Sequence, residues 1–288
     1  MSVSSIYVYL YQDDLIFDRQ SKMKKEKMKE INSFGRKDCS NYEEVLVKTE
    51  DGYTHKCWYV KARNHKNKPV ILYFPGNGEY LEKYVRTFDY ITNRVDANIF
   101  SCPNRGCGTN EETPSEEYFY KDAYIYLNHL KQSKRNKIFI FGSSMGAAVA
   151  LETASKYQND VYGLILQNPF LSMERMAHDK KPFLYFFLFN YDLLIRTRMD
   201  NEKTIKNLHI PILFNVSEKD EMVSTEHSKI LYEICPSKNK FMYIAKNGTH
   251  DNILINDKGE YHQSMKIFIE TAISLKDVNK EKEENKNR

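Results

Sequence analysis

One short stretch combines a serine with the spacing that a nucleophilic residue requires. Ser144 stands at the centre of Gly142-Ser-Ser-Met-Gly146, with a glycine two residues before it and two residues after it. This is the G-x-S-x-G pattern of a nucleophile elbow, a sharp strand-to-helix turn in which side chains at the flanking positions would clash. Ser143 fits less well, because neither of its neighbours at these offsets is glycine. The chemistry expected of Ser144 is covalent attack on a carbonyl carbon.

The residues on either side of the motif match the elements that an elbow joins. Ile138 to Phe141 are four apolar residues in a row, typical of a central parallel strand that is buried on both faces. Ala147, Ala148 and Ala150 follow the motif, and their small side chains let a helix pack close to the sheet. The pattern alone occurs in many unrelated chains, so this context is what favours an elbow.

A serine hydroxyl needs a base, and the base needs an acid to orient it. In sheets that carry such an elbow the chain order is serine, acid, histidine. Of the eight histidines, three lie late enough, namely His227, His250 and His262. His227 falls inside a helical pattern and His262 near the start of the last predicted helix, so we expect surface roles for both. His250 lies in a loop directly after the last predicted strand, where catalytic groups gather, and is the predicted base.

The orienting acid should follow the strand predicted at residues 212–216. Three carboxylates stand there, Glu218, Asp220 and Glu221. Asp220 is the predicted acid. The alternative is that all three belong to a solvated turn.

Acyl transfer also needs two backbone N–H groups that face the developing negative charge, an oxyanion hole. Met145, directly after the nucleophile, supplies one candidate. Asn77, in the loop after the strand predicted at residues 70–74, supplies the other. The alternative for Pro75 to Gly78 is a tight turn with no such role.

The order of the predicted elements indicates an α/β fold. Two strands, 42–48 and 53–60, flank Asp51-Gly52, a dipeptide typical of hairpin turns. Further strands are predicted at residues 70–74, 97–102, 138–141, 163–167, 212–216 and 241–245, with helices between them. This alternation predicts a mostly parallel central sheet with helices on both faces. Residues 171–208 interrupt it, and we expect them to form a small cap insertion.

The predicted domain runs from residue 41 to residue 275. Residues 1–40 form an N-terminal segment, expected to be peripheral to the domain or close to a membrane. Ser115 is placed to cap the helix that follows it. Residues 276–288 consist mainly of Lys, Glu and Asn, which predicts a charged, disordered tail.

Composition excludes several classes of protein. The net charge of +4 is spread along the chain and gives no nucleic-acid signal. The five cysteines are an odd number without C-x-x-C spacing, so we expect no disulfide framework, no zinc site and a reducing compartment. No apolar run approaches the roughly 18 residues of a membrane span, and no signal peptide is visible. These features predict a protein of the cytoplasmic side, free or peripheral to a membrane.

Taken together, the motifs resemble those of the α/β-hydrolase superfamily. More closely they resemble its bud-emergence-type branch, the α/β-hydrolase-domain proteins that include acyl-protein thioesterases. The resemblance spans about residues 42–275 and rests on Tyr73–Asn77, Asn104–Gly108, Thr113–Glu117, Gly142–Gly146, Asp220–Val223 and Gly248–His250. Tyr11 to Phe17 also resembles the segment that precedes the domain in that branch.

Two positions depart from the branch pattern. The family usually has His-Gly where this chain has Pro75-Gly76, and an Asp-Tyr-Arg-Gly-Tyr-Gly run where this chain has Pro103 to Gly108. Both departures concern the loops around the oxyanion hole, and the three triad positions are unaffected.

The residues and the resemblance together predict a serine hydrolase. Ser144 attacks the carbonyl of an acyl ester or thioester, His250 moves the proton, and Asp220 holds the imidazole. The resemblance implies a palmitoyl-protein thioesterase or lipid esterase, with a lipidated protein or a membrane lipid as substrate and no metal or organic cofactor. The alternatives are a hydrolase of small esters or peptides, and a non-catalytic scaffold that keeps the fold for binding.

The most apolar run of the chain, Phe183 to Phe189, falls inside the predicted insertion. Phe183, Phe186 and Phe187 are therefore candidates for the wall of an acyl-chain slot. The alternative is that the run only packs the insertion against the domain.

Overall fold

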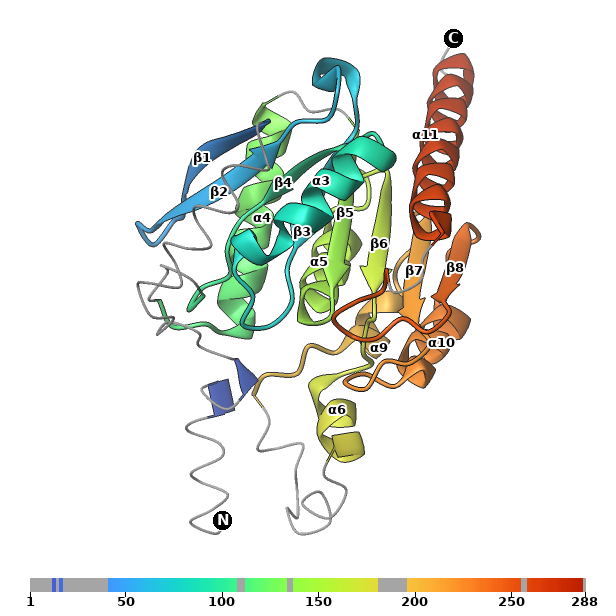
Figure 1. Cartoon of the computed structure of the whole chain (residues 1–288). Coiled ribbons are helices and arrows are strands. Elements are labelled where there is room, and N and C mark those ends of the chain that lie inside the picture. Colours follow the sequence, from blue (N-terminus) through green and yellow to red (C-terminus); the bar gives the residue numbers. More distant parts are fainter. Residues whose placement is uncertain are drawn as a thin grey trace, which may run out of the picture.

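A computed structural model of the chain describes residues 12–13, 16–17, 41–107, 112–133, 137–180, 196–254 and 258–286. Its centre is one eight-stranded sheet with the order β1-β2-β4-β3-β5-β6-β7-β8 (Figure 1). The strands are β1 (Tyr42–Lys48), β2 (Thr54–Val60), β3 (Val70–Phe74), β4 (Asn98–Ser101), β5 (Ile138–Ser143), β6 (Gly163–Gln167), β7 (Ile212–Ser217) and β8 (Lys240–Ala245). β1, β2 and β4 pair antiparallel, whereas β4, β3, β5, β6, β7 and β8 pair parallel. The prediction of a mostly parallel sheet is correct.

The first two strands form the hairpin that the sequence predicted. Lys48 lies opposite Thr54, and the turn between them contains Asp51 and Gly52. Gly52 has a φ angle of +92°, a conformation that residues with a Cβ rarely adopt.

Helices cover both faces of the sheet, as predicted. They are α3 (Val85–Arg94), α4 (Glu116–Gln132), α5 (Met145–Lys156), α6 (Met173–Lys180), α9 (Asn201–Ile205), α10 (Thr225–Ile234) and α11 (Glu260–Lys286), with short 3₁₀ turns η1 (His65–Asn67) and η2 (Leu81–Tyr84). α3 and α11 lie on one face, where Phe88 and Phe268 belong to a common apolar core. α4, α5 and α10 lie on the other, where Phe119 and Leu231 belong to a second core. Every residue of the central strands β3 and β5 is buried, because both faces of these strands meet a core.

Two helix ends bear on the sequence predictions. Ser115 caps α4, because its side chain accepts a hydrogen bond from the Tyr118 N–H, as predicted. The tail predicted to be disordered from residue 276 is instead helical as far as Lys286. Lys and Glu favour helix when they follow one already formed, and the prediction weighed their polarity alone.

The cysteine prediction also needs correction. Cys57 and Cys102 form a disulfide. Trp58 in β2 lies opposite Ser101 in β4, so the next pair outward is Cys57 and Cys102. The two cysteines are 45 residues apart in the chain, and only the pairing of β2 with β4 brings them together.

The insertion between β6 and β7 contains α6 and α9, and α6 lies beyond the carboxyl ends of the parallel strands, in the lower part of Figure 1. Residues 181–195 fall outside the described residues, and with them the candidate wall Phe183, Phe186 and Phe187. Among the helices of the described part, none combines the length and apolar character that crossing a membrane requires.

A buried arginine fixes the loop between β4 and α4. Arg105 is 3% exposed and donates to both carboxylate oxygens of Asp122, each at 2.7 Å. It also donates to Asp51 at 2.7 Å. Hydrogen bonds from Arg105 and then from Thr49 hold the pKa of Asp51 well below its usual range. The loop that carries Asn104 is therefore anchored to the hairpin and to α4.

Candidate active site

Ser144 occupies a strained turn between β5 and α5. Its φ and ψ angles are 53° and −118°, a region that residues with a Cβ seldom adopt. The turn is held by the Ser144 N–H, which donates to the Gln167 carbonyl of the neighbouring strand at 2.9 Å. The Ser143 hydroxyl, by contrast, accepts from the Gln167 side chain at 3.2 Å. This geometry is that of the predicted elbow.

Both glycines of the motif are required by close backbone contacts. A Cβ atom at Gly142 would lie 2.1 Å from the Gly146 carbonyl oxygen, and one at Gly146 would lie 2.2 Å from the Phe74 carbonyl oxygen. Such distances are impossible for carbon and oxygen, so only glycine fits at either position. The spacing seen in the sequence thus follows from how tightly α5 turns back across β3 and β5.

His250 and Asp220 complete a chain of hydrogen bonds that begins at Ser144. Ser144 Oγ lies 3.0 Å from His250 Nε2, and His250 Nδ1 lies 2.7 Å and 3.0 Å from the two oxygens of Asp220. Because Nδ1 faces a carboxylate, it keeps the ring proton, and Nε2 presents a lone pair to the serine hydroxyl. The side chains of His250 and Asp220 are 12% and 2% exposed, so little water reaches the pair.

The backbone holds the Asp220 carboxylate in place. Its Oδ1 accepts from the N–H groups of Met222 and Val223 at 2.8 Å and 2.7 Å. These two hydrogen bonds fix the orientation of the carboxylate toward the imidazole.

The carboxylates of Glu218 and Glu221 bind the backbone of the loop that carries His250, and not its imidazole ring. Glu221 accepts from the His250 backbone N–H at 3.2 Å, and Glu218 accepts from the Asn247 N–H at 3.1 Å. The alternative in which all three are a solvated turn is therefore wrong. Asp220 binds the imidazole, while Glu218 and Glu221 position the chain that carries it.

Asn168 joins three strand ends beneath the site. It follows β6, has a φ angle of +47°, and accepts from the Ser217 N–H at 2.8 Å. Its amide donates to Ser217 Oγ at 3.1 Å and to the His250 carbonyl at 3.4 Å. This buried side chain therefore fixes the distance between the acid loop and the histidine loop.

The loop after β3 is braced from three directions. The Gly76 N–H donates to the Tyr84 hydroxyl at 3.1 Å, and the Asn104 amide donates to the Gly76 carbonyl at 3.2 Å. The Asn77 amide donates to the carbonyl of Ile16 at 2.8 Å. Pro75 thus begins a loop whose position is set by hydrogen bonds from elsewhere in the chain.

Met145 and Asn77, the two predicted oxyanion donors, line the same cavity as Ser144 and His250. Met145 is the first residue of α5, and the first N–H groups of a helix have no acceptor within it. An N–H group in this position is suited to hold a negatively charged oxygen.

The cavity around Ser144 has a volume of about 510 Å³. Its apolar lining includes Ile16, Phe170, Met173, Met176, Met222 and Val223, and its polar lining includes Glu79, Lys83, Gln167 and Asp251. Lys83 Nζ lies 2.5 Å from Glu79, yet burial raises the pKa of the Glu79 carboxyl. The site therefore offers both apolar and charged surface to a bound molecule.

The remaining candidate histidines are buried, so the prediction of surface roles for them is wrong. His227 is 3% exposed, its Nε2 lies 2.7 Å from Asp179, and its Nδ1 accepts from the Leu171 N–H at 3.0 Å. His262 is 4% exposed, with its ring centroid 3.6 Å from that of Tyr90. Each lies on the inner face of its helix, which the polarity of histidine did not reveal.

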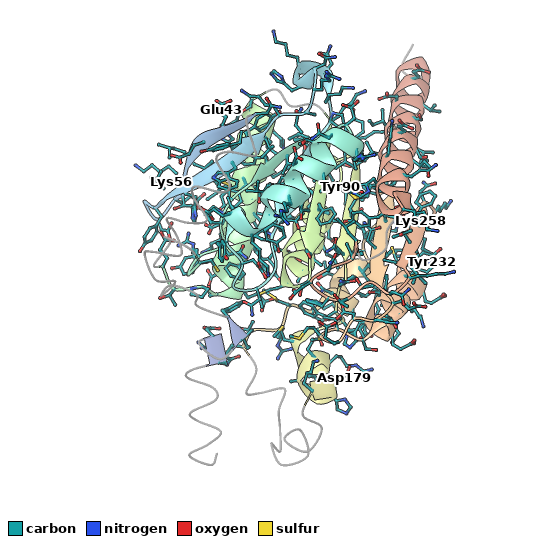
Figure 2. The ribbon with its side chains drawn as sticks, in the orientation of Figure 1. Glu43, Lys56, Tyr90, Asp179, Tyr232 and Lys258 are labelled. Atoms are coloured by element: carbon teal, nitrogen blue, oxygen red, sulfur yellow. A yellow bond between two sulfur atoms is a disulfide. The ribbon has the colours of Figure 1, made fainter. Side chains whose placement is uncertain are left out.

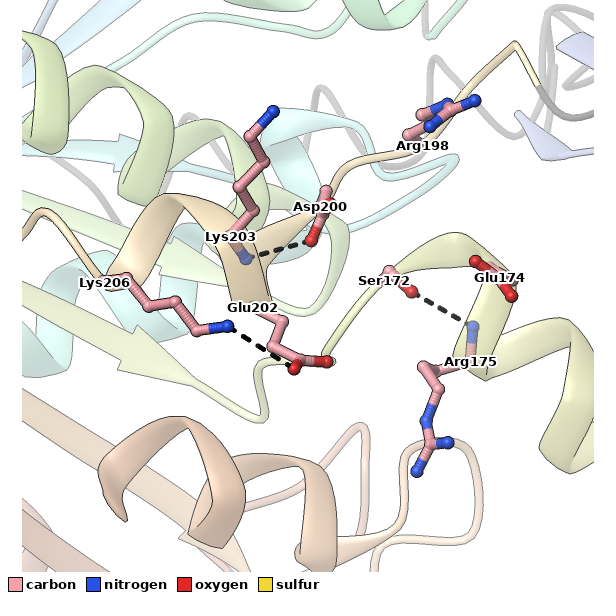
Figure 3. A pocket seen from close by; sticks show the side chains of 8 residues that line it. All are labelled: Ser172, Glu174, Arg175, Arg198, Asp200, Glu202, Lys203 and Lys206. Carbon is pink, nitrogen blue, oxygen red and sulfur yellow. Dashed lines mark hydrogen bonds and ion pairs between the residues drawn. The ribbon is translucent and has the colours of Figure 1, made fainter. Parts of the chain in front are cut away.

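A second cavity, of about 250 Å³, lies between α6 and α9 (Figure 3). It is lined by Ser172, Glu174, Arg175, Arg198, Asp200, Glu202, Lys203 and Lys206. Several of these residues bond to one another, as Lys206 does to Glu202 at 3.8 Å. No histidine is among these eight residues, and within the described ranges no cluster of His, Cys, Asp and Glu is placed to hold a metal ion.

Comparison with known proteins supports the fold. The family model described as "Serine aminopeptidase, S33" matches residues 65–191. Esterase Pf2001 of Pyrococcus furiosus superposes with a TM-score of 0.67 at 18% identity, covering 81% of this chain and 91% of that one. The chain has the fold of the α/β-hydrolases.

Two fungal relatives match most of the length of this chain. "Uncharacterized membrane protein YNL320W" of Saccharomyces cerevisiae is 29% identical over 262 residues, 89% of this chain and 88% of the relative. Protein bem46 of Schizosaccharomyces pombe is 26% identical over 259 residues, 87% of this chain and 84% of the relative. The predicted resemblance to the bud-emergence-type branch is confirmed.

Several residues of the hydrolase site were missed by sequence reasoning. Met173 and Met176 are three positions apart on α6, a spacing that could have marked them as one face of a helix. Tyr84 and Asn168 carry no motif. Ile16 lies 128 residues before Ser144, in a segment that resembled one of the branch, but no motif or periodic pattern placed it in the site.

Proposed function

We propose that the protein is a serine hydrolase that cleaves acyl esters or thioesters through Ser144, His250 and Asp220. The observation that carries the proposal is the continuous chain of hydrogen bonds from Ser144 Oγ to His250 at 3.0 Å and from His250 to Asp220 at 2.7 Å. A hydroxyl, an imidazole and a carboxylate in this order convert serine into a nucleophile.

In the first half of the reaction, Ser144 Oγ attacks the carbonyl carbon while its proton passes to His250 Nε2. Asp220 keeps the proton on Nδ1 and stabilises the imidazolium that forms. The N–H groups of Met145 and Asn77 hold the oxyanion of the tetrahedral intermediate. That intermediate collapses as the bond to oxygen or sulfur breaks. His250 then gives its proton to the leaving alcohol or thiol, and the acyl group remains on Ser144.

In the second half, a water molecule replaces the leaving group. His250 takes a proton from the water as its oxygen attacks the acyl carbon. The bond to Ser144 Oγ breaks, the serine recovers its proton from His250, and a carboxylic acid is released. These steps need no metal or organic cofactor.

For the substrate, we propose an acyl chain of medium or long length, carried by a lipidated protein or a membrane lipid. The apolar lining from Ile16, Phe170, Met173 and Met176 supports this proposal. Each buried CH₂ contributes about 0.8 kcal/mol, or roughly threefold to fourfold in kcat/KM per methylene. Such a substrate would bring the enzyme to the cytoplasmic surface of a membrane.

A peptide hydrolase is the second candidate, because the matching family model is described as a serine aminopeptidase. Measuring kcat/KM for C2 to C16 acyl esters, their thioester counterparts and aminoacyl anilides separates the two. Rates that rise with chain length up to C8 or beyond support the acyl hydrolase. A monotonic fall beyond C4 with efficient anilide cleavage would favour the peptide hydrolase. If the intact protein cleaves none of these esters, thioesters and anilides, the remaining hypothesis is a non-catalytic scaffold.

A further inference from the structure

We propose that four residues far upstream of the elbow form a wall of the acyl cavity and determine which chain lengths the enzyme accepts. They are Gln12, Asp13, Ile16 and Phe17, together called the N-terminal segment below. This inference rests on the proposed function, because it assigns the lining of that same site.

The N-terminal segment is bound to the chain that returns from the insertion. The Gln12 side-chain oxygen accepts from the N–H groups of Arg196 and Thr197 at 2.6 Å and 3.1 Å. Asp13 accepts from the Thr197 hydroxyl at 2.7 Å and lies 3.2 Å from the Arg196 guanidinium. Gln12 is 3% exposed, and a buried amide oxygen with two backbone donors defines one position for its chain.

The same segment is anchored in the core. Phe17 is 2% exposed, and its ring meets Phe119 of α4 edge to face, with centroids 5.0 Å apart. The Phe17 N–H donates to the Asp13 carbonyl at 2.9 Å, which ties the two ends of the segment together. An aromatic side chain this deeply buried ties the segment to the hydrolase fold.

Ile16 lies between these two anchors and lines the cavity that contains Ser144 and His250. Its carbonyl accepts from the Asn77 amide at 2.8 Å. The residue proposed as an oxyanion donor through its backbone therefore also positions Ile16 through its side chain. Asn77 couples the catalytic loop to the wall.

The chemistry of the lining explains why Ile16 should set chain length. Met173 and Met176 are unbranched and adapt to what they contact. Ile16 is β-branched, with one preferred side-chain rotamer, and its backbone is fixed on both sides. A short acyl group can reach Ser144 without touching such a wall, whereas a long chain must pack along it. Changes at Ile16 should therefore act on long chains more than on short ones.

The test uses ethyl and dodecyl fluorophosphonates, which label the proposed nucleophile directly. The measured quantity is the ratio of the two second-order labelling rates, dodecyl over ethyl. Ile16→Trp should lower this ratio at least tenfold, and Ile16→Ala by about fourfold to tenfold. Ile267→Trp is the matched control, because Ile267 is 54% exposed on α11, and its ratio should equal that of the native protein.

Variants of Gln12 test whether the hydrogen bonds of the N-terminal segment hold Ile16 in place, because Gln12 itself does not line the cavity. Gln12→Leu removes the acceptor of two N–H groups and should lower the ratio about threefold to tenfold. Gln12→Glu keeps an oxygen in the same place and should retain the native ratio.

The outcomes are distinct. If the native protein reacts with neither probe, the proposed function fails. If it reacts but the ratio in Ile16→Trp and Ile16→Ala stays within twofold of the native value, the function stands and the wall is overturned. An equal loss with both probes in Gln12→Leu would also overturn the wall, because it would show a structural role only.

Discussion

Two histidine–aspartate pairs in this protein share one contact and differ in the other. In each, a ring nitrogen lies 2.7 Å from a carboxylate oxygen, His250 with Asp220 and His227 with Asp179. The second nitrogen of His250 faces the Ser144 hydroxyl in a cavity, whereas that of His227 accepts from the Leu171 backbone N–H. The pair alone therefore does not indicate catalysis.

The two pairs also hold their protons on opposite nitrogens. His250 donates from Nδ1 and leaves Nε2 to receive a proton, while His227 receives at Nδ1 and donates from Nε2 to Asp179. Asp179 lies on α6, which extends below the sheet in Figure 2, and its side chain is 40% exposed against 2% for Asp220. One pair is enclosed around a nucleophile, and the other fastens the insertion to α10.

The largest expected difference between the pairs is in activity. Ser144→Ala and His250→Ala should each lower kcat/KM on an acetyl ester by about 10⁴-fold to 10⁶-fold, because the triad acts as a unit. His227→Asn, which keeps an oxygen acceptor near Leu171, should stay within about threefold of the native value. Steady-state hydrolysis of the three purified variants checks this. If His250→Ala were active and His227→Asn were folded but inactive, His227 and not His250 would be the catalytic base.

The two aspartates should differ by a smaller factor. Asp220→Asn should lower kcat about 10³-fold to 10⁴-fold, because the amide can stabilise the wrong tautomer of His250. It should keep roughly ten to a hundred times more activity than Ser144→Ala. Asp179→Asn should leave kcat near the native value. Comparable losses in both aspartate variants would mean that the pairs are not functionally distinct.

Stability should show the reverse order. His227→Ala leaves the Leu171 N–H buried without its acceptor, which should cost about 1–3 kcal/mol in the free energy of unfolding. His227→Asn should recover part of that loss. Urea unfolding at pH 7 measures both. If His227→Ala matches the native midpoint, the pair does not fasten the insertion.

The smallest expected effect depends on pH. Burial alone would raise the pKa of Asp179, but hydrogen bonds from His227 and His178 outweigh it and leave the pKa below the usual 3.8. A carboxyl with a lowered pKa stabilises the fold above its unfolded pKa, and the effect disappears as pH falls through the folded pKa. The stability difference between the native protein and Asp179→Asn should therefore be present at about pH 5 and vanish in stronger acid. Because Asp179 is exposed, a few tenths of a kcal/mol are expected.

The sequence predicted those parts of the site that depend on local geometry. Gly142 and Gly146 are required by contacts of the short turn that contains Ser144, so a five-residue motif reveals them. Asp220 and His250 each follow a strand that can be recognised in the sequence by its apolar residues. Parallel strands end at one edge of the sheet, so chain order alone brought these three residues together.

What the sequence did not predict depends on contacts between distant segments. The burial of His227 follows from Asp179 and Leu171 in the insertion, and the place of Ile16 follows from bonds to Asn77 across 61 residues. The Cys57–Cys102 bond likewise needs the pairing of β2 with β4. Neither the periodicity of apolar residues nor a sequence motif predicts such contacts.

The most direct test is to locate the fluorophosphonate adduct by mass spectrometry of the digested protein. The adduct is expected on the peptide that contains Ser144 in the native protein and in His227→Asn at a similar rate. It should be absent from Ser144→Ala and greatly slowed in His250→Ala. Full labelling of Ser144→Ala, on Ser143 or any other residue, would contradict the assignment of Ser144 as nucleophile.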